Sequence, residues 1–219
     1  MTIDSTTFSN GSALVQVFHE TYGQPIREVP ELDAPERNMR MGLIQEEYTE
    51  LADAQNANDF IEVVDAWADI VYVTYGAGKT HGVDLDQVIL NASFPAHADH
   101  GNYVIRDTPQ LEVAERYDVM EIIRAEYSQL AEDYNRNDFE KVQEGWANII
   151  YAVYGAAFTH GVDLNAVLLE VQRSNLSKLG TDEDGNKVVL RREDGKILKG
   201  PDFSQPDILA SLKEQGYEG

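Results

Sequence analysis

The chain contains no cysteine, few basic residues and no long apolar run, and each absence excludes a class of protein. Without cysteine, its 219 residues form no disulfide, thiolate zinc site or cysteine nucleophile, which fits a cytoplasmic protein. Only 17 basic residues stand against 39 acidic ones, and the net charge of −22 repels nucleic acids and anionic lipid. No stretch approaches the roughly 18–20 apolar residues of a membrane span, and the first residues lack the pattern of a signal peptide. We therefore expect a cytoplasmic protein with no nucleic-acid or membrane partner.

The sequence contains an internal repeat. Residues Met41–Leu90 align without gaps with Met120–Leu169, and roughly half of the aligned positions are identical. The shared segments include EYxxLA, NDF and THGVDL. This degree of identity indicates two homologous halves in one chain.

Each copy is expected to form two long helices and a shorter third one. Apolar spacing and capping signals predict helices near 12–22, 36–56, 59–80, 84–91, 111–136, 138–160 and 163–178. Near the carboxyl terminus, VVLRREDGKILKG alternates around an Asp-Gly pair, which predicts a hairpin. The expected fold is all-α, an antiparallel helix bundle of two fused repeats that forms an intramolecular pseudo-dimer with a C-terminal hairpin tail.

This organisation predicts four parts of the chain. They are a first helical repeat (1–95), a linker (96–110), a second helical repeat (111–180) and a tail (181–219).

The segment IQEEYTEL of the first copy carries three glutamates. On a helical projection, Leu43 and Leu51 lie in the buried arc, and Glu47 falls inside that arc. Glu46 and Glu50 lie at its edges. A purely solvated surface therefore does not explain Glu47.

The next predicted helix carries Glu62, Asp65 and Asp69 on one face, although most of its circumference is apolar. Two acidic clusters on adjacent helices can share a cavity, where they raise each other's pKa unless a cation lies among them. Oxygen ligands without His or Cys favour Mg²⁺, with Mn²⁺ as a substitute. The alternative is a structural salt network, for which these helices contain few basic residues.

The pair of segments EEYTEL and EVVDAWADIVY resembles the all-α nucleoside triphosphate pyrophosphohydrolases. These are the MazG-like enzymes, with dimeric dUTPases and phosphoribosyl-ATP pyrophosphohydrolase as relatives. Their signature is ExxE, a spacer and ExxD. Glu47 and Glu50 match the first part, and Glu62 and Asp65 match the second at the short end of the spacer range.

One position departs from the family pattern. In many relatives the acid just before the apolar LLY-like run is a ligand, here Asp69, but its usual glutamate partner position holds Ala66. Which of Glu62, Asp65 and Asp69 bind metal therefore stays open. The resemblance extends into RSNLSK (Arg173–Lys178) and the tail segment REDGKILKGPDF.

The second copy lacks most of the acids of the first. The aligned pairs that differ, first copy before second, are Glu46 and Ala125, Glu50 and Gln129, Glu62 and Lys141, and Asp69 and Asn148. Glu47 is retained as Glu126, and Asp65 becomes Glu144. We expect no metal in the second copy.

The third helix shows the reverse loss, because SNLSK of the second copy aligns with PAHAD (Pro95–Asp99) of the first. The resemblance implies that Asn175 and Lys178 lie near the nucleotide and its phosphates. We therefore expect one composite site, with the metal held by the first copy and the substrate by the second. The alternative is that the second copy is only a decayed scaffold.

The resemblance implies a Mg²⁺-dependent hydrolase that converts a nucleoside triphosphate to a monophosphate and pyrophosphate, with a (deoxy)pyrimidine triphosphate as candidate substrate. The site residues that we expect are Glu46 as general base, Glu47, Glu50, Glu62, Asp65 and Asp69 as metal ligands, and Arg173, Asn175 and Lys178 as substrate-binding residues. A further homodimer of pseudo-dimers is compatible with the sequence. Two alternatives stay open: a nucleotide- and metal-binding module with weakened catalysis, and an all-α phosphohydrolase for another phosphate ester.

Overall fold

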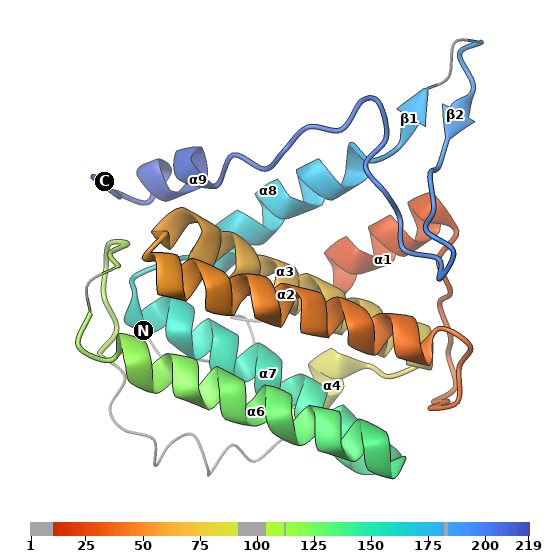
Figure 1. Cartoon of the computed structure of the whole chain (residues 1–219), viewed down its shortest axis with the longest axis horizontal. Helices are drawn as coiled ribbons and strands as arrows, with labels where there is room; N and C mark the ends of the chain where they lie inside the picture. Colours follow the sequence, from red (N-terminus) through yellow and green to blue (C-terminus); the bar gives the residue numbers. More distant parts are fainter. Residues whose placement is uncertain (1–10, 92–103, 112, 182–183) are drawn as a thin grey trace.

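The protein is a helical bundle with a short hairpin near its carboxyl terminus (Figure 1). The computed structural model describes residues 11–91, 104–111, 113–181 and 184–219. The helices are α1 (Gly11–Tyr22), α2 (Arg37–Ala57), α3 (Phe60–His81), α4 (Leu85–Asn91), α6 (Arg116–Arg136), α7 (Phe139–Thr159), α8 (Leu164–Leu176) and α9 (Ile208–Glu214). The strands β1 (Gly180–Thr181) and β2 (Lys187–Val188) pair antiparallel. The predicted all-α fold class with a C-terminal hairpin is confirmed.

The turn between the two long helices has the same geometry in both copies. Asn58 and Asn137 adopt left-handed backbone angles, with φ of 57° and 62°, at the ends of α2 and α6. The next residues, Asp59 and Asp138, cap α3 and α7, because each carboxylate accepts a hydrogen bond from the backbone amide three residues later, at 3.2 and 3.3 Å. The NDF segment of each copy therefore makes a sharp turn between two antiparallel helices.

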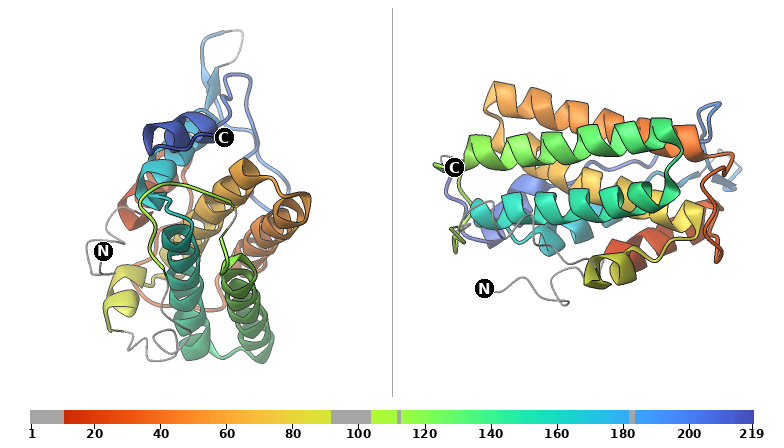
Figure 2. Two further views of the ribbon diagram at one scale, coloured as in Figure 1. Left: turned by 90° about the vertical axis from the view of Figure 1, so that its left-hand side faces the viewer. Right: turned by 90° about the horizontal axis from the view of Figure 1, so that it is seen from below.

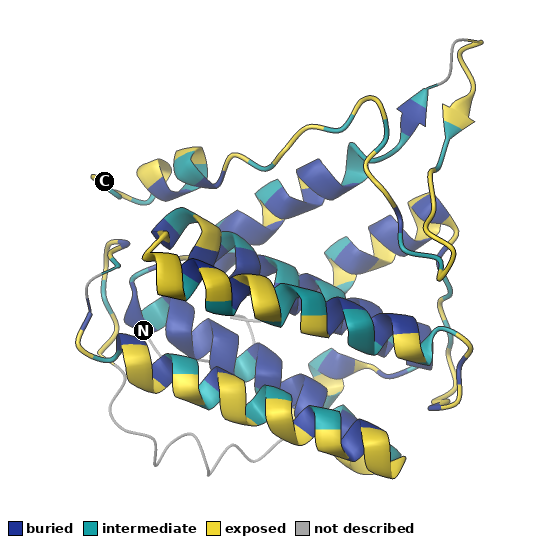
Figure 3. Ribbon diagram, viewed as in Figure 1, coloured by how far each residue is buried: buried dark blue, intermediate teal, exposed yellow. Residues whose placement is uncertain are grey.

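The core lies along α3 and α7. These helices pack against each other, α2 and α6 cover one side, and α1 and α8 pack on α3 (Figures 1 and 2). Burial follows this arrangement, since α3 and α7 are largely buried whereas α2 and α6 expose one face (Figure 3). No helix within the described residues is both long and apolar enough to cross a membrane.

Aligned residues of the two copies meet across the bundle. Tyr48 of α2 stacks on its counterpart Tyr127 of α6, with ring centroids 4.2 Å apart and an interplanar angle of 9°. The reciprocal ring pairs, with centroid separations, are Trp67–His160 at 5.0 Å and His81–Trp146 at 5.2 Å. Such matched contacts are those that an approximate twofold axis between α2–α3 and α6–α7 produces.

The segment after α8 differs from the sequence-based expectation in detail. Besides β1 and β2, an isolated bridge joins Arg191 to Ile197 around the predicted Asp194-Gly195 turn. We call residues 190–199 the tail strap. The short helix α9 was not predicted, and the first helix of the second copy begins at Arg116 rather than near 111.

The predicted division into repeats, linker and tail stays a prediction. Residues 104–110 are non-helical, as expected of a linker. The remainder of the linker, and the PAHAD segment aligned with SNLSK, lie outside the described residues.

Candidate active site

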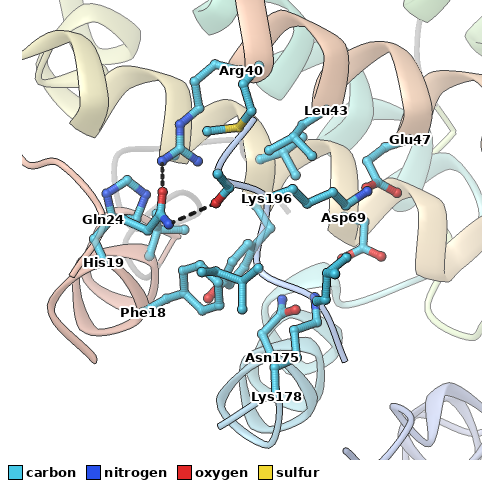
Figure 4. A pocket seen from close by; sticks show the side chains of 18 of the residues that line it. Phe18, His19, Gln24, Arg40, Leu43, Glu47, Asp69, Asn175, Lys178 and Lys196 are labelled. Carbon is cyan, nitrogen blue, oxygen red and sulfur yellow. Dashed lines mark hydrogen bonds between the residues drawn. The ribbon is translucent and has the colours of Figure 1, made fainter. Parts of the chain in front are cut away.

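A cavity of about 460 Å³ lies among α1, α2, α3, the end of α8 and the tail strap (Figure 4). Of these segments, α2 and α3 belong to the first copy and α8 to the second, whereas α1 precedes the copies and the strap follows them. The charged and amide side chains at one end are Glu47 and Glu50 of α2, Asp69 of α3, Asn175 and Lys178 at the end of α8, and Lys196 of the strap.

Glu47 has the most strongly raised pKa of the three acids Glu47, Asp65 and Asp69. Burial raises its pKa to about 9, and the nearby carboxylates of Asp69 and Glu50 add to the rise. The ammonium groups of Lys196 and Lys178 act in the opposite direction but do not cancel it. The sequence-based expectation that Glu47 points inward therefore agrees with its place in the cavity wall.

The acids of α3 belong to the same electrostatic cluster. Burial raises the pKa of Asp65 to about 7, reinforced by Asp69, Glu62 and Glu50. Burial also raises the pKa of Asp69 to about 6, with Lys178 opposing and Glu50 reinforcing the shift. Carboxyl groups with raised pKa values lack sufficient positive charge around them.

The chemistry of these groups fits a hard divalent cation. The Oδ1 atom of Asp65 is buried and accepts no hydrogen bond from the described residues. Glu50 and Glu62 are exposed and leave the cluster open on one side. No three His, Asp or Glu side chains of the described part already stand close enough to enclose an ion. The choice among the five predicted ligands therefore stays a prediction.

Asn175 and Lys178 reach the cavity because α8 packs against α1 and α3. The Tyr22 hydroxyl donates to the Asn175 and Leu176 carbonyls at 3.0 and 2.9 Å, which holds the end of α8 beside α1. Burial lowers the pKa of Lys178, although the carboxylates of Asp69 and Glu47 oppose this effect. The second copy thus contributes a buried ammonium group to the carboxylates of the first.

Four predicted site residues, Glu46, Glu62, Asp65 and Arg173, lie outside the cavity wall. Arg173 pairs with Glu170 at 2.8 Å and donates to the Gln205 carbonyl at 2.7 Å, so it binds the segment before α9. Glu46 accepts hydrogen bonds from Arg192 at 3.0 Å and from Lys196. Burial alone would raise the pKa of Glu46, but these two cations outweigh it and lower the pKa.

The opposite end of the cavity is formed by residues that sequence reasoning did not single out. Arg40 is 4% exposed and donates to Gln24 at 3.0 Å. The Nδ1 atom of His19 lies 2.8 Å from the Pro25 carbonyl, and burial together with the Arg40 charge lowers the pKa of His19 to about 4. A neutral imidazole and a buried guanidinium therefore face this end (Figure 4).

Lys196, Lys199 and the strap that carries them were also missed as site residues, although the segment was quoted for its resemblance. Both lysines line the cavity, whereas the strap was expected only as a hairpin. The signal was the run GKILKG, where two lysines three positions apart follow a predicted turn.

The family comparison supports one class for the first copy, the all-α nucleoside triphosphate pyrophosphohydrolases. Within it, residues 15–93 match the phosphoribosyl-ATP pyrophosphohydrolase family, so the resemblance stated from the sequence is confirmed. The match begins within α1 and includes α2, α3 and α4, and it indicates a nucleotide pyrophosphohydrolase activity.

The similarity to a curated relative extends over both copies. An uncharacterized protein of Acanthamoeba polyphaga mimivirus is 28% identical, over an alignment that covers 90% of this chain and 93% of the relative. No solved structure matches the chain significantly.

Proposed function

We propose that the protein is a Mg²⁺-dependent nucleoside triphosphate pyrophosphohydrolase with one composite active site. One observation carries this proposal: two half-buried acids of the first copy, Glu47 and Asp69, face Lys178 of the second copy in a single cavity. The family match supports the reaction class. Because that match ends before the second copy, the assignment of Lys178 and Asn175 depends on the cavity.

In this proposal Glu47, Glu50 and one or two of the three acids of α3 would hold the ion; these acids are Glu62, Asp65 and Asp69, and Asp69 is the one that lines the cavity. Bound Mg²⁺ would supply positive charge to the triphosphate and to the departing pyrophosphate. The site orients a water toward the α-phosphorus. Its oxygen bonds to the α-phosphorus while a general base, the predicted role of Glu46, takes one of its protons, the bond from the α-phosphorus to the α,β-bridging oxygen breaks, and the products are a nucleoside monophosphate and pyrophosphate.

Lys178 offsets the charge of the phosphate chain from the side opposite the acids, and the Asn175 amide contacts nucleotide or phosphate. Arg173 would need to leave Glu170 to take part. Glu46 would need to leave Arg192 and Lys196 to act as the general base. Deoxypyrimidine triphosphates are the first candidate substrates, on the resemblance to dimeric dUTPases alone.

Pyrophosphate release tests the proposal. The wild type is assayed with Mg²⁺ on standard ribo- and deoxyribonucleoside triphosphates and dUTP, beside Glu47→Ala and Lys178→Ala. Glu126→Ala, the aligned position of the second copy, and Lys187→Ala in β2 serve as matched controls. We expect loss of turnover in both site variants, with the controls and the circular dichroism spectra unchanged.

Turnover that survives Glu47→Ala contradicts the assignment of the acids. Turnover that survives Lys178→Ala contradicts the composite site and favours a decayed second copy. If the protein releases no pyrophosphate but nucleotide and Mg²⁺ raise its melting temperature, the alternative holds, a nucleotide- and metal-binding module with weakened catalysis.

A further inference from the structure

The tail strap is a well-formed turn across the cavity. The Arg192 amide donates to the Lys196 carbonyl at 2.8 Å, and the Leu198 amide donates to the Leu190 carbonyl at 2.9 Å. Gly195 has φ of 97°, a left-handed value that other residues rarely adopt, which allows the tight turn. Residues 195–199 line the cavity, so one side of the turn faces any bound ligand.

The strap is attached at both sides of the cavity. On the α1 side, Arg191 donates to the Tyr22 carbonyl, and the Gln24 amide donates to the Gly195 carbonyl at 3.3 Å. On the α2 side, the attachment is the Glu46 carboxylate. Glu46 is thus the residue of α2 that holds the strap.

The Glu46 attachment uses two cations of the strap. Both terminal nitrogens of Arg192 lie 3.0 Å from one Glu46 oxygen, and Lys196 donates to the other oxygen. Asp194 also binds Arg192, at 2.7 Å, which fixes the guanidinium toward α2. Charge-assisted hydrogen bonds from two cations to one carboxylate hold the strap on α2 more firmly than a single hydrogen bond would.

The strap places the ammonium groups of Lys196 and Lys199 in the cavity that the acids of α2 and α3 line. Lys196 opposes the burial-driven rise in the pKa of Glu47, and Lys199 opposes that of Asp65. Together with Lys178, they place three ammonium groups beside the acids. Once a divalent cation neutralises the carboxylates, these groups can bind an anion of several charges, such as a chain of phosphates, and Lys196 keeps two N–H donors for it beside the one given to Glu46.

We propose that Lys196 and Lys199 bind the phosphate chain of the substrate, and that Glu46 is a positioning residue that holds the strap over it. This inference rests on the proposed function and names two substrate-binding residues for the same site. It gives Glu46 a role other than general base, and the two roles predict different behaviour for Glu46→Gln.

The first experiment measures how firmly the strap is held. The strap contains the trypsin sites Arg191, Arg192, Lys196 and Lys199, so limited trypsin digestion with mass spectrometry reports cleavage within it. We expect Glu46→Gln to speed this cleavage by about 10-fold, since it removes a charged attachment. Glu132→Gln is the matched control, because it removes an exposed glutamate that pairs with Arg136 at 2.8 Å far from the strap.

The second experiment uses inorganic tripolyphosphate with Mg²⁺ as a probe of the phosphate site alone. Calorimetric titration of Lys196→Gln and Lys199→Gln should show Kd values raised about 10-fold, with Lys187→Gln as the matched control. Tripolyphosphate should also slow tryptic cleavage of the wild-type strap. For an active substrate, the lysine variants should raise KM far more than they lower kcat.

The outcomes separate the roles of Glu46. If Glu46→Gln lowers kcat about 100-fold or more, with tryptic rate and tripolyphosphate Kd as in the wild type, Glu46 is the base and the positioning role is overturned. Equal Kd values for both lysine variants and the wild type overturn the phosphate site. If no nucleoside triphosphate is hydrolysed but tripolyphosphate binding still depends on Lys196 and Lys199, the proposed reaction fails and the strap inference stands.

Discussion

The two copies share a scaffold and differ in chemistry. The ring contacts Trp67–His160 and His81–Trp146 have nearly equal separations, 5.0 and 5.2 Å. At the positions of the acidic cluster the copies diverge, since Lys141 pairs with Glu144 at 2.6 Å on an exposed surface. A repeat can therefore keep its core and lose its charged groups, which shows that the acids of the first copy are not needed for the helical fold.

The largest effect on activity is expected when the aligned residues Asp69 and Asn148 are exchanged between the two copies. Asp69→Asn places the second-copy residue in the first copy, and we expect activity to fall by at least roughly 100-fold, because a proposed metal ligand is lost. Without metal, the variant should also melt at a higher temperature, since a buried carboxyl with a raised pKa is removed. Steady-state assays and thermal melts check both effects.

Asn148→Asp is the matched control and should retain activity. Full activity in Asp69→Asn would mean that this carboxylate is not part of the site.

The second largest difference between the two copies should appear in how the free energy of unfolding depends on pH. The pKa values of Glu47, Asp65 and Asp69 are raised to about 9, 7 and 6, so the folded state binds more protons than the unfolded state. Stability without metal is then lost as the pH rises from the ordinary values of 3.8 and 4.5 to the raised values, by at most about 1.4 kcal/mol per pH unit for each proton, and the part of the loss above pH 6 comes mainly from Asp65 and Glu47. Thermal melts between pH 6 and 9 measure this loss.

Saturating Mg²⁺ should raise the melting temperature most at the high end of this range, where the carboxylates are ionised and bind the ion. A Glu126→Gln variant should follow the wild-type curve. A wild-type curve that is unaffected by Mg²⁺ at every pH would contradict a metal site among these acids.

Equivalent substitutions in the cores of the two copies should lower the free energy of unfolding by equal amounts. Trp67 and Trp146 are fully buried, and the indole N–H of Trp67 has no hydrogen-bond partner among the described residues, whereas Trp146 lies beside Tyr134. Trp67→Phe and Trp146→Phe should therefore each cost about 1–3 kcal/mol of unfolding free energy through lost packing. Urea unfolding measures both, and a difference above about 1 kcal/mol would show that the two cores are not equivalent.

The smallest effect is expected at Glu62. It is exposed and acts on the cluster through Asp65, whereas its counterpart is Lys141. Glu62→Gln should reduce activity by less than about 10-fold, because screening by solvent weakens its influence. A loss as large as that of Asp69→Asn would instead identify Glu62 as a direct ligand.

Much of the fold could be predicted from sequence because its signals are local. The NDF turns supply an Asn at the helix end and a capping Asp next to it, and both turns form as expected. The inward direction of Glu47 also followed from its angular position on the helix. The helix α9 was missed, since its seven residues offer little periodicity.

The candidate site was only partly predictable because it joins distant segments. Glu47 and Lys178 were singled out, and both line the cavity. The attachment of Arg192 to Glu46 joins residues 146 positions apart, and no local pattern encodes such a contact. Arg173 shows the opposite case, since a residue within a matching motif binds the segment before α9 instead of facing the cavity.

The sequence by itself determined the two homologous halves, the helices of each half, and the acids that only one half retains. These features depend on helical periodicity, capping and side-chain type, which act within a few residues. Only the tertiary structure decided that Lys178 and the tail strap meet those acids across one cavity. The reason is physical: burial and charge pairing depend on which segments pack together, and that packing is a property of the whole folded chain.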